Sequence, residues 1–185
     1  MEMSASEVEA VVADTCAWLE RAVIGLELCP FAKAVYAGDR IRYRVSAARD
    51  EDALLNDLVH ELSVLHSTPE HMCETTLLMH PWVLTDFTDY RLFLDAADAK
   101  IHSLGFRGEF QIASFHPRYQ FAGTTPDDIG NFTNRSPYPM LHLLREASVE
   151  RAVAAIPDVA TIFERNIETL RRLGVDGWRQ MFPHL

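Results

Sequence analysis

Two histidines in the same short sequence context are the first candidates for chemistry. His80 and His116 each follow an apolar run, in TLLMHP and QIASFHP, and each precedes a proline. Imidazole titrates near neutral pH, so two rings that share one crevice could serve as general acid and general base. They could equally be two ligands of a metal ion, or each ring could bond backbone groups at the end of its strand. Because the pair occurs twice at matching positions, we take His80 and His116 as the candidate catalytic residues.

A polar segment further along the chain supplies the candidates for holding a substrate. They are Asn134, Arg135, Ser136 and, in the preceding irregular stretch, Tyr119. Ser136 before Pro137 is typical of a helix that begins there, and such a helix would place Arg135 near its positive end, where anions bind. The alternative is a structural ion pair between Arg135 and Asp127 or Asp128.

Cys29 is a further candidate. The segment CPF also opens the active-site helix of glutaredoxin-like and glutathione-transferase-like folds, but a strand precedes it there, whereas the pattern here predicts a helix before Cys29. A second cysteine at Cys-x-x-Cys spacing is missing, so we expect a buried, unactivated thiol. The sequence also lacks a dinucleotide-binding glycine motif and a P-loop, and we predict no particular cofactor and no metal ligand. A metal ion held by the two histidines remains an alternative.

Hydrophobic periodicity places these residues in an α/β fold. Alternating or continuous apolar runs predict strands, and apolar residues three and four apart predict helices. The expected order is a helix over 6–26, a strand over 41–45, a helix over 50–66, a strand over 75–79, a helix over 86–104, a strand over 110–115, and two C-terminal helices over 137–156 and 158–173. We therefore predict a single compact domain over residues 1–185, with a short, mainly parallel three-stranded sheet and helices on its faces.

The crossovers of such a fold determine where the candidate residues lie. Right-handed βαβ crossovers align the C-terminal ends of the strands at one edge, where ligands bind in open α/β sheets. His80 and His116 would both lie at this edge. Residues 117–136 show no helical or strand period but contain apolar side chains, so we expect an ordered loop folded over the strand ends.

The amino-acid composition limits the classes of partner that the chain can bind. The chain has 185 residues with 27 acidic and 17 basic side chains, and its formal net charge of -10 disfavours binding to nucleic acid. The apolar runs are too short to span a bilayer, and the first residues lack the pattern of a signal peptide. Three scattered cysteines, Cys16, Cys29 and Cys73, suit a reducing compartment. We expect a cytoplasmic protein with a small-molecule ligand and without nucleic-acid or membrane partners, and we predict no oligomeric state.

Four segments together resemble the bacterial domain of unknown function 1415 family. They are LCPFAK at 28–33, TLLMHP at 76–81, QIASFHP with YQFA at 111–122, and TNRSPYPMLHLLRE at 133–146. The resemblance covers nearly the whole chain and implies a single-domain bacterial protein. It implies no reaction, cofactor or catalytic residue.

Our leading hypothesis from the sequence is an enzyme, a hydrolase or group transferase, that acts on a small polar or anionic metabolite at the C-terminal edge of the sheet. Paired histidines and an arginine suit such chemistry better than redox chemistry, which requires a cofactor motif. The alternatives are a non-enzymatic ligand-binding or assembly protein, and a histidine-based metal-binding protein.

Overall fold

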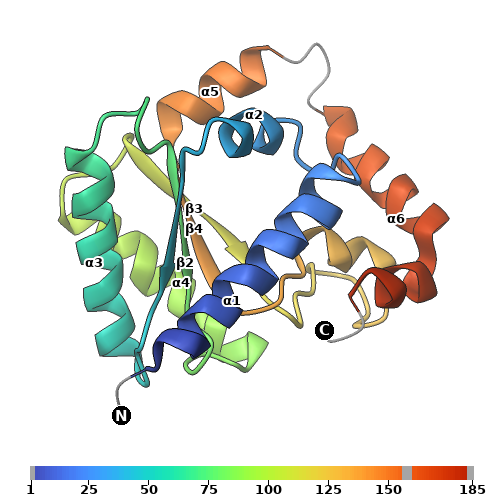
Figure 1. Ribbon diagram of the computed structural model, residues 1–185, viewed down its shortest axis with the longest axis horizontal. Coiled ribbons are helices and arrows are strands. Elements are labelled where there is room, and N and C mark those ends of the chain that lie inside the picture. Colours follow the sequence, from blue (N-terminus) through green and yellow to red (C-terminus); the bar gives the residue numbers. More distant parts are fainter. Residues whose placement is uncertain (1–2, 156–159, 183–185) are drawn as a thin grey trace.

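A four-stranded mixed sheet lies at the centre of the molecule (Figure 1). The computed structural model describes residues 3–155 and 160–182. The strands lie in the order β1 (Ile41–Val45), β2 (Thr75–Met79), β4 (Met140–Arg145) and β3 (Phe110–Phe115). β1 and β2 are parallel, whereas β4 runs antiparallel to both of its neighbours, β2 and β3. β1, β2 and β3 therefore point in the same direction, and their C-terminal ends share one edge.

The fourth strand corrects the predicted topology. We expected three mainly parallel strands and a helix over 137–156, but Met140–Arg145 is a strand inserted between β2 and β3. The segment MLHLLR is apolar at spacings that fit a helix as well as a buried strand. Its backbone pairs on both sides, and Leu141 and Leu143 are fully buried, which is typical of a central strand. The helix that follows, α5 (Glu146–Ala154), occupies only the second half of the predicted range.

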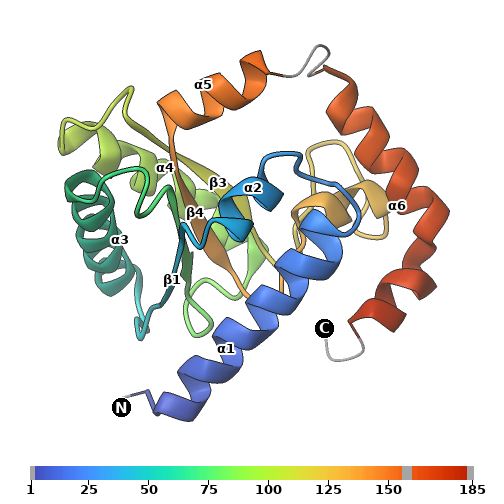
Figure 2. The ribbon, with the colours of Figure 1, turned by 45° about the horizontal axis from the view of Figure 1, so that its top comes forward.

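Helices cover both faces of the sheet, as the two views show (Figures 1 and 2). One face is covered by α3 (Glu51–Ser67) and α4 (Phe87–Ser103), and the other by α1 (Ala5–Trp18), its π-helical continuation η1 (Leu19–Ile24) and α2 (Ala32–Ala37). α6 (Ala160–Met181) packs against a 3-10 helix, η2 (Ile129–Asn134). The side chains of Ser4, Asp50 and Asp86 cap the N-termini of α1, α3 and α4 by accepting backbone N–H bonds.

Strand side chains alternate between the two faces and so supply two apolar cores. Leu78 and Leu141 join the core beneath α3 and α4, whereas Leu77 and Met140 join the core beneath α1. The predicted strands at 75–79 and 110–115 agree with β2 and β3. This alternation decides which residues face each side of the sheet, and it positions both candidate sites described below.

The edge strand β1 shows the predicted alternation of apolar and basic residues. Its arginines point toward α3, where the carboxylate of Glu61 is fully buried. Arg42 donates to this carboxylate through Nε at 2.6 Å, and Arg44 lies 3.7 Å from it. The two guanidinium groups compensate the buried negative charge and fix α3 against the edge of the sheet.

The C-terminal region agrees with the prediction in part. The predicted helix over 158–173 corresponds to α6, in which Gly174, the predicted stop, has a left-handed backbone with φ of 69° before the helix resumes. Pro157, the predicted break before this helix, lies outside the described residues. Among the helices that the structure describes, none is long and apolar enough to cross a membrane.

Candidate functional site

The structure brings His80 and His116 to one edge of the sheet. His80 follows β2 and His116 follows β3, and their backbone N–H groups donate to the carbonyls of Pro139 and Asn134 at 2.9 and 3.2 Å. Both side chains are buried, with 0% exposure. The ring of Tyr90 on α4 lies 5.8 Å from the imidazole of His80 and 5.1 Å from that of His116, measured between centroids. The two imidazoles therefore pack on one tyrosine instead of facing an open crevice.

Backbone groups define the tautomer of each ring. Nδ1 of His116 accepts from the N–H of Arg118 at 2.9 Å, so the proton sits on Nε2, which donates to the carbonyl of Leu84 at 3.2 Å. In His80 it is Nδ1 that donates, to the carbonyl of Val83 at 2.9 Å. Nε2 of His80 is therefore a buried lone pair, and it has no hydrogen-bond partner among the described residues.

Burial lowers the pKa of both imidazoles to about 4. Loss of hydration is the largest cause for each ring, and the proximity of His116 lowers the pKa of His80 further. Both rings are therefore neutral at pH 7. This geometry suits the structural interpretation, in which each imidazole satisfies backbone groups. The acid-base role stays a prediction, because both rings are buried and each donates to a carbonyl of the segment 83–84.

The predicted helix start at Ser136 is wrong. Arg135 is the C-cap of η2, at the negative rather than the positive end of a short helix, and the chain then extends into β4. The side-chain amide of Asn134 donates to the carbonyl of Ser114 at 3.0 Å. The hydroxyl of Ser136 donates to the carbonyl of Tyr138 at 2.7 Å. The side chains of Asn134 and Ser136, which were expected to hold an anion, thus donate to backbone carbonyls.

The guanidinium group of Arg135 is also bonded to backbone. Nε donates to the carbonyl of Tyr119 at 3.3 Å and Nη2 to that of Pro126 at 2.6 Å. The group lies 4.3 Å from the ring centroid of Phe132. Burial lowers the pKa of Arg135, and the charge of Asp127 opposes this shift. Carbonyl groups thus take the place of the aspartate partner that we considered from the sequence.

We expect Arg135→Ala to lower the free energy of unfolding by about 1–3 kcal/mol, because the substitution leaves backbone carbonyls without their charged donor and removes a contact with an aromatic ring. Urea denaturation would measure the loss. Arg165→Ala, on the exposed surface of α6, is the matched control and should change stability little. Equal stability of the two variants would contradict the structural role of Arg135.

The loop over residues 117–136 is ordered, as predicted, around the buried side chain of Asn131. Its Oδ1 accepts from the N–H of Phe121 and from the hydroxyl of Thr124, both at 2.9 Å, and its Nδ2 donates to the carbonyl of Thr125 at 2.8 Å. One amide side chain therefore joins both halves of the loop.

Tyr119 lies in this loop among aromatic neighbours. Its ring centroid is 5.1 Å from that of Phe87 and 5.0 Å from that of Phe121. These three rings and Arg91 line a half-open hollow of about 540 Å³ at the surface. Tyr119 thus lines a concave surface together with an arginine, and its binding role stays a prediction.

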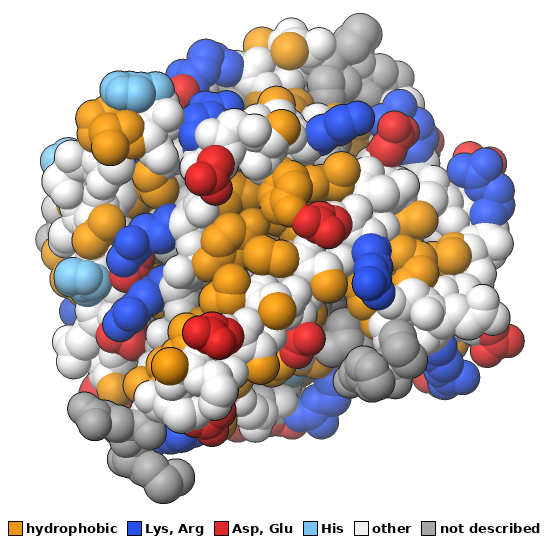
Figure 3. All heavy atoms as spheres, viewed as in Figure 1, with side chains coloured by type: hydrophobic (Ala, Val, Ile, Leu, Met, Phe, Trp, Pro, Cys, Tyr) orange, Lys and Arg blue, Asp and Glu red, His pale blue; other side chains and the backbone are white. Residues whose placement is uncertain are grey.

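A second site, which the sequence argument missed, is an apolar pocket between the sheet and α1; we call it the α1-face pocket. Its volume is about 260 Å³. The strands provide its floor, α1, η1 and α2 its walls, and α5 one end. The apolar lining includes Trp18, Val23, Phe31, Val35, Phe115 and Leu144. Figure 3 shows apolar side chains gathered on this face of the molecule, between α1 and α2.

Strand register explains why the floor is open. Leu77, His142 and Ala113 form one row across β2, β4 and β3. Ala113 contributes only a methyl group to this row. In the wall, the indole Nε1 of Trp18 donates to the carbonyl of Arg135 at 2.8 Å, which fixes the ring. A small residue in the floor and a fixed indole in the wall leave the space unfilled.

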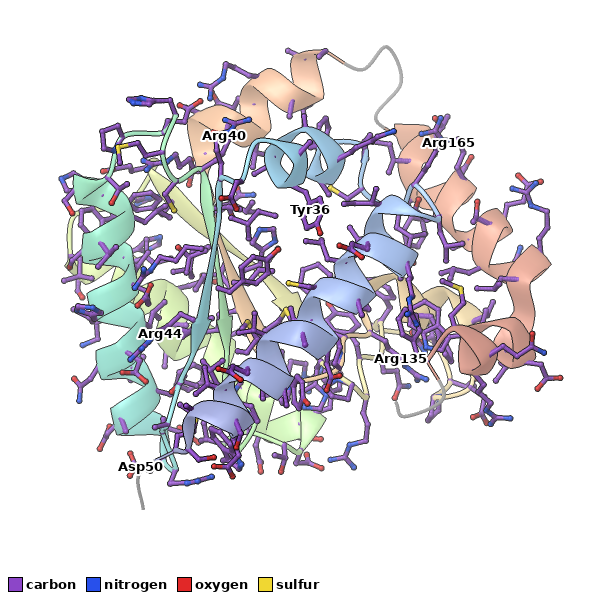
Figure 4. All side chains as sticks on the ribbon, viewed as in Figure 1. Tyr36, Arg40, Arg44, Asp50, Arg135 and Arg165 are labelled. Carbon is purple, nitrogen blue, oxygen red and sulfur yellow. The ribbon has the colours of Figure 1, made fainter. Side chains whose placement is uncertain are left out.

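A contact between α2 and η1 completes the wall. Tyr36 of α2 points toward α1 in Figure 4, and its hydroxyl donates to the carboxylate of Glu20 on η1. Val35, the residue before it, lines the pocket. The short helix α2, which has no buried residue of its own, is therefore held over the pocket by a polar bond at the surface.

His142 and Thr75 are polar side chains in the floor of the pocket. Nε2 of His142 lies 2.7 Å from the hydroxyl of Thr75, and burial lowers the pKa of His142 to about 4, so the ring is neutral. The sequence pattern placed His142 in the helix predicted over 137–156. In a strand, however, His142 shares a face with Met140 and Leu144, and a histidine on an otherwise apolar strand face is the signal that could have identified it.

The charged groups at the rim of the pocket are partly paired, and Nε of Arg145 is buried without a hydrogen-bond partner among the described residues. Glu74 forms an ion pair with Arg40. Arg145 donates through Nη2 to the carbonyls of Leu65 and Thr68, both at 2.7 Å, at the C-terminal end of α3. The cation therefore compensates the negative end of a helix.

Cys29 also lines the pocket, and it is half-buried rather than buried as we expected from the sequence. It lies in the turn between η1 and α2, and its N–H donates to the carbonyl of Val23 at 3.3 Å. α2 begins three residues later, at Ala32, so the thiol does not occupy the helix N-terminal position of glutaredoxin-like folds. In the described part of the chain, no group of three or more His, Cys, Asp or Glu side chains is arranged to hold a metal ion.

The family described as "Protein of unknown function (DUF1415)" matches residues 10–180. The chain belongs to this family. The match confirms the resemblance seen in the four sequence segments, and it extends over the strand edge and the α1-face pocket of this DUF1415 chain. Neither a curated protein nor a solved structure matches the chain.

Proposed function

We propose that the chain binds a small, uncharged and largely apolar molecule in the α1-face pocket. The observation that carries the proposal is a pocket of about 260 Å³ whose walls are apolar and whose floor holds one neutral imidazole. Ligand sites are typically concave and mainly apolar, with few polar groups that orient the ligand. An apolar cavity of about 150 Å³ accommodates benzene, so this pocket has room for a molecule of two fused rings.

The charges around the pocket favour an uncharged ligand. Glu74 and Arg40 neutralise each other, and Arg145 is bonded to carbonyl groups. A cationic ligand would lose its hydration without gaining a free carboxylate, and an anionic ligand would gain only the single unpaired Nε of Arg145, so burial of a charge is costly in this apolar site. The binding proposal therefore differs in ligand chemistry from the anionic metabolite expected from the sequence.

The second proposal is acid-base chemistry by His80 and His116 on a polar metabolite at the strand edge. The observation that favours it is the unpartnered Nε2 of His80. It requires the segment 83–84 to open, because each ring donates to one carbonyl of this segment. Rapid modification of either ring by diethyl pyrocarbonate in the folded protein, located by peptide mapping, would support it. Protection of both rings until unfolding would oppose it.

The binding proposal predicts that Ala113→Phe abolishes binding without loss of stability. The new ring would enter the floor of the pocket, beside His142, and occupy the space that the ligand needs. Filling a cavity also tends to maintain or raise the free energy of unfolding. Naphthalene is the probe, its binding is followed by equilibrium dialysis, and we expect its affinity to fall by about tenfold or more.

The matched control is Ala99→Phe, which adds the same ring on the exposed surface of α4. This variant should bind naphthalene as the native chain does. If the native chain does not bind naphthalene or other uncharged two-ring molecules, or if Ala113→Phe binds equally well, the proposal is wrong.

A further inference from the structure

A hydrogen-bond chain in the floor of the α1-face pocket fixes the proton on His142. The hydroxyl oxygen of Thr75 lies 2.6 Å from the carbonyl oxygen of Leu143 and 2.7 Å from Nε2 of His142. A carbonyl oxygen can only accept, so the single proton of the Thr75 hydroxyl goes to Leu143. Nε2 of His142 must then carry a proton and donate it to Thr75. The ring nitrogen Nδ1 is left with a lone pair.

This lone pair has no partner within the described chain. The ring of His142 lines the pocket, its neighbours across the sheet are Leu77 and Ala113, and the nearest aromatic ring, that of Phe115, is 6.1 Å away between centroids. None of these side chains carries a donor. An acceptor that faces an apolar pocket gains most from a ligand that brings a hydrogen-bond donor to it.

The chemistry of the acceptor selects among ligand classes. A carboxylate has no proton to donate, and it would require His142 to be protonated, which burial opposes. A protonated amine would bring a positive charge, but the acidic group at the rim, Glu74, is already paired with Arg40. An uncharged hydroxyl group supplies the donor without a charge. The flat, apolar shape of an aromatic ring suits the remaining walls, which include Trp18 and Phe115.

We infer that the ligand of the α1-face pocket is a small hydroxylated aromatic molecule, of the phenol or naphthol class, whose hydroxyl donates to Nδ1 of His142. The inference rests on the proposed binding function and adds the ligand's single polar group. His142 is then the residue that selects the ligand, and Thr75 is a positioning residue that holds its tautomer.

Three molecules of similar size test the inference: naphthalene, 1-naphthol and 1-naphthoate. With the native chain we expect 1-naphthol to bind up to about tenfold more tightly than naphthalene, the effect of one buried hydrogen bond, and 1-naphthoate to bind most weakly. In His142→Phe the preference for 1-naphthol over naphthalene should disappear. Thr75 keeps its bond to Leu143 in this variant, and circular dichroism would check its fold.

Nitrogen-15 NMR of His142 in the native chain gives a measurement that needs no variant. The spectrum of the free protein should show the tautomer protonated at Nε2, and addition of 1-naphthol, but not of naphthalene, should shift the Nδ1 resonance. If none of the three molecules binds, the proposed function itself fails. If naphthalene and 1-naphthol bind equally, an apolar site stands but the hydroxyl inference is overturned. Tightest binding of 1-naphthoate would overturn it in favour of anion recognition.

Discussion

Lowering the pH from 7.5 to 5 is expected to reduce the free energy of unfolding by several kcal/mol. Three histidines, His80, His116 and His142, have a pKa lowered to about 4 in the folded chain, against 6.5 for a free side chain. Between these two values the unfolded chain binds protons that the folded chain does not, so stability falls as the pH decreases through 6.5 and levels off below 4. At pH 5 a histidine shifted this far destabilises the fold by about 2 kcal/mol. Together the three approach the total stability of a typical domain, about 5–15 kcal/mol.

Urea denaturation at pH 7.5, 6.5 and 5 measures this effect. His142→Phe removes one of the three titrating groups, so its stability should depend less on pH than that of the native chain. His71→Asn, which replaces an exposed histidine, is the matched control variant. A native chain that is equally stable at pH 7.5 and pH 5 would show that the three rings are hydrated or protonated in the folded state.

The sequence predicted the parts of the fold in which local pattern and burial agree. The continuous apolar run of β2 and the capped, amphipathic helices α3 and α4 have one interpretation each. The run MLHLLR has two possible interpretations, because the spacing of Met140, Leu143 and Leu144 also fits a helix. It becomes a strand only through its pairing with two neighbouring strands. Long-range pairing of this kind leaves no local signal in a single sequence.

For the candidate site at the strand edge, the sequence predicted the position of the two histidines but not their surroundings. The position of His80 and His116 at one sheet edge followed from the direction of β2 and β3. The burial of the two rings could not be predicted from the sequence. It depends on the ring of Tyr90, which lies on a helix, and on backbone carbonyls, which every residue type has. Arg135 is a similar case. Its positive charge led us to predict an anionic ligand, but in the structure its guanidinium group donates to backbone carbonyls, which a sequence does not reveal as partners.

The α1-face pocket could not be predicted from local sequence at all. Its floor residue Ala113 and its wall residue Trp18 are far apart in the chain and meet only in the folded structure. His142 was visible in the sequence, but its assignment to a helix removed the strand alternation that places it on an apolar face. Because β4 was predicted as a helix, the sequence argument did not identify the α1-face pocket.

Tyr90→Phe is expected to lower the free energy of unfolding by about 1–3 kcal/mol, and Tyr90→Ala by about 3–5 kcal/mol or more. Tyr90 is fully buried, and its hydroxyl donates to the carbonyl of Met140 at 2.8 Å and accepts from the N–H of Phe115 at 3.1 Å. Removing the hydroxyl takes away the partner of the buried carbonyl of Met140 and of the half-buried N–H of Phe115, where β3 ends and β4 begins. Removing the ring also takes away the surface on which both His80 and His116 pack.

Tyr138→Phe is the matched control, because its hydroxyl bonds Asp14 at the surface at 2.7 Å and its loss should change stability by less than about 0.5 kcal/mol. Urea denaturation of the three variants gives the comparison. A large difference between Tyr90→Phe and Tyr138→Phe supports a rigid, structural strand edge around His80 and His116. If Tyr90→Phe is as stable as the control, the edge is loosely held. The rings of His80 and His116 could then reach a substrate, and the acid-base proposal would gain over binding in the α1-face pocket.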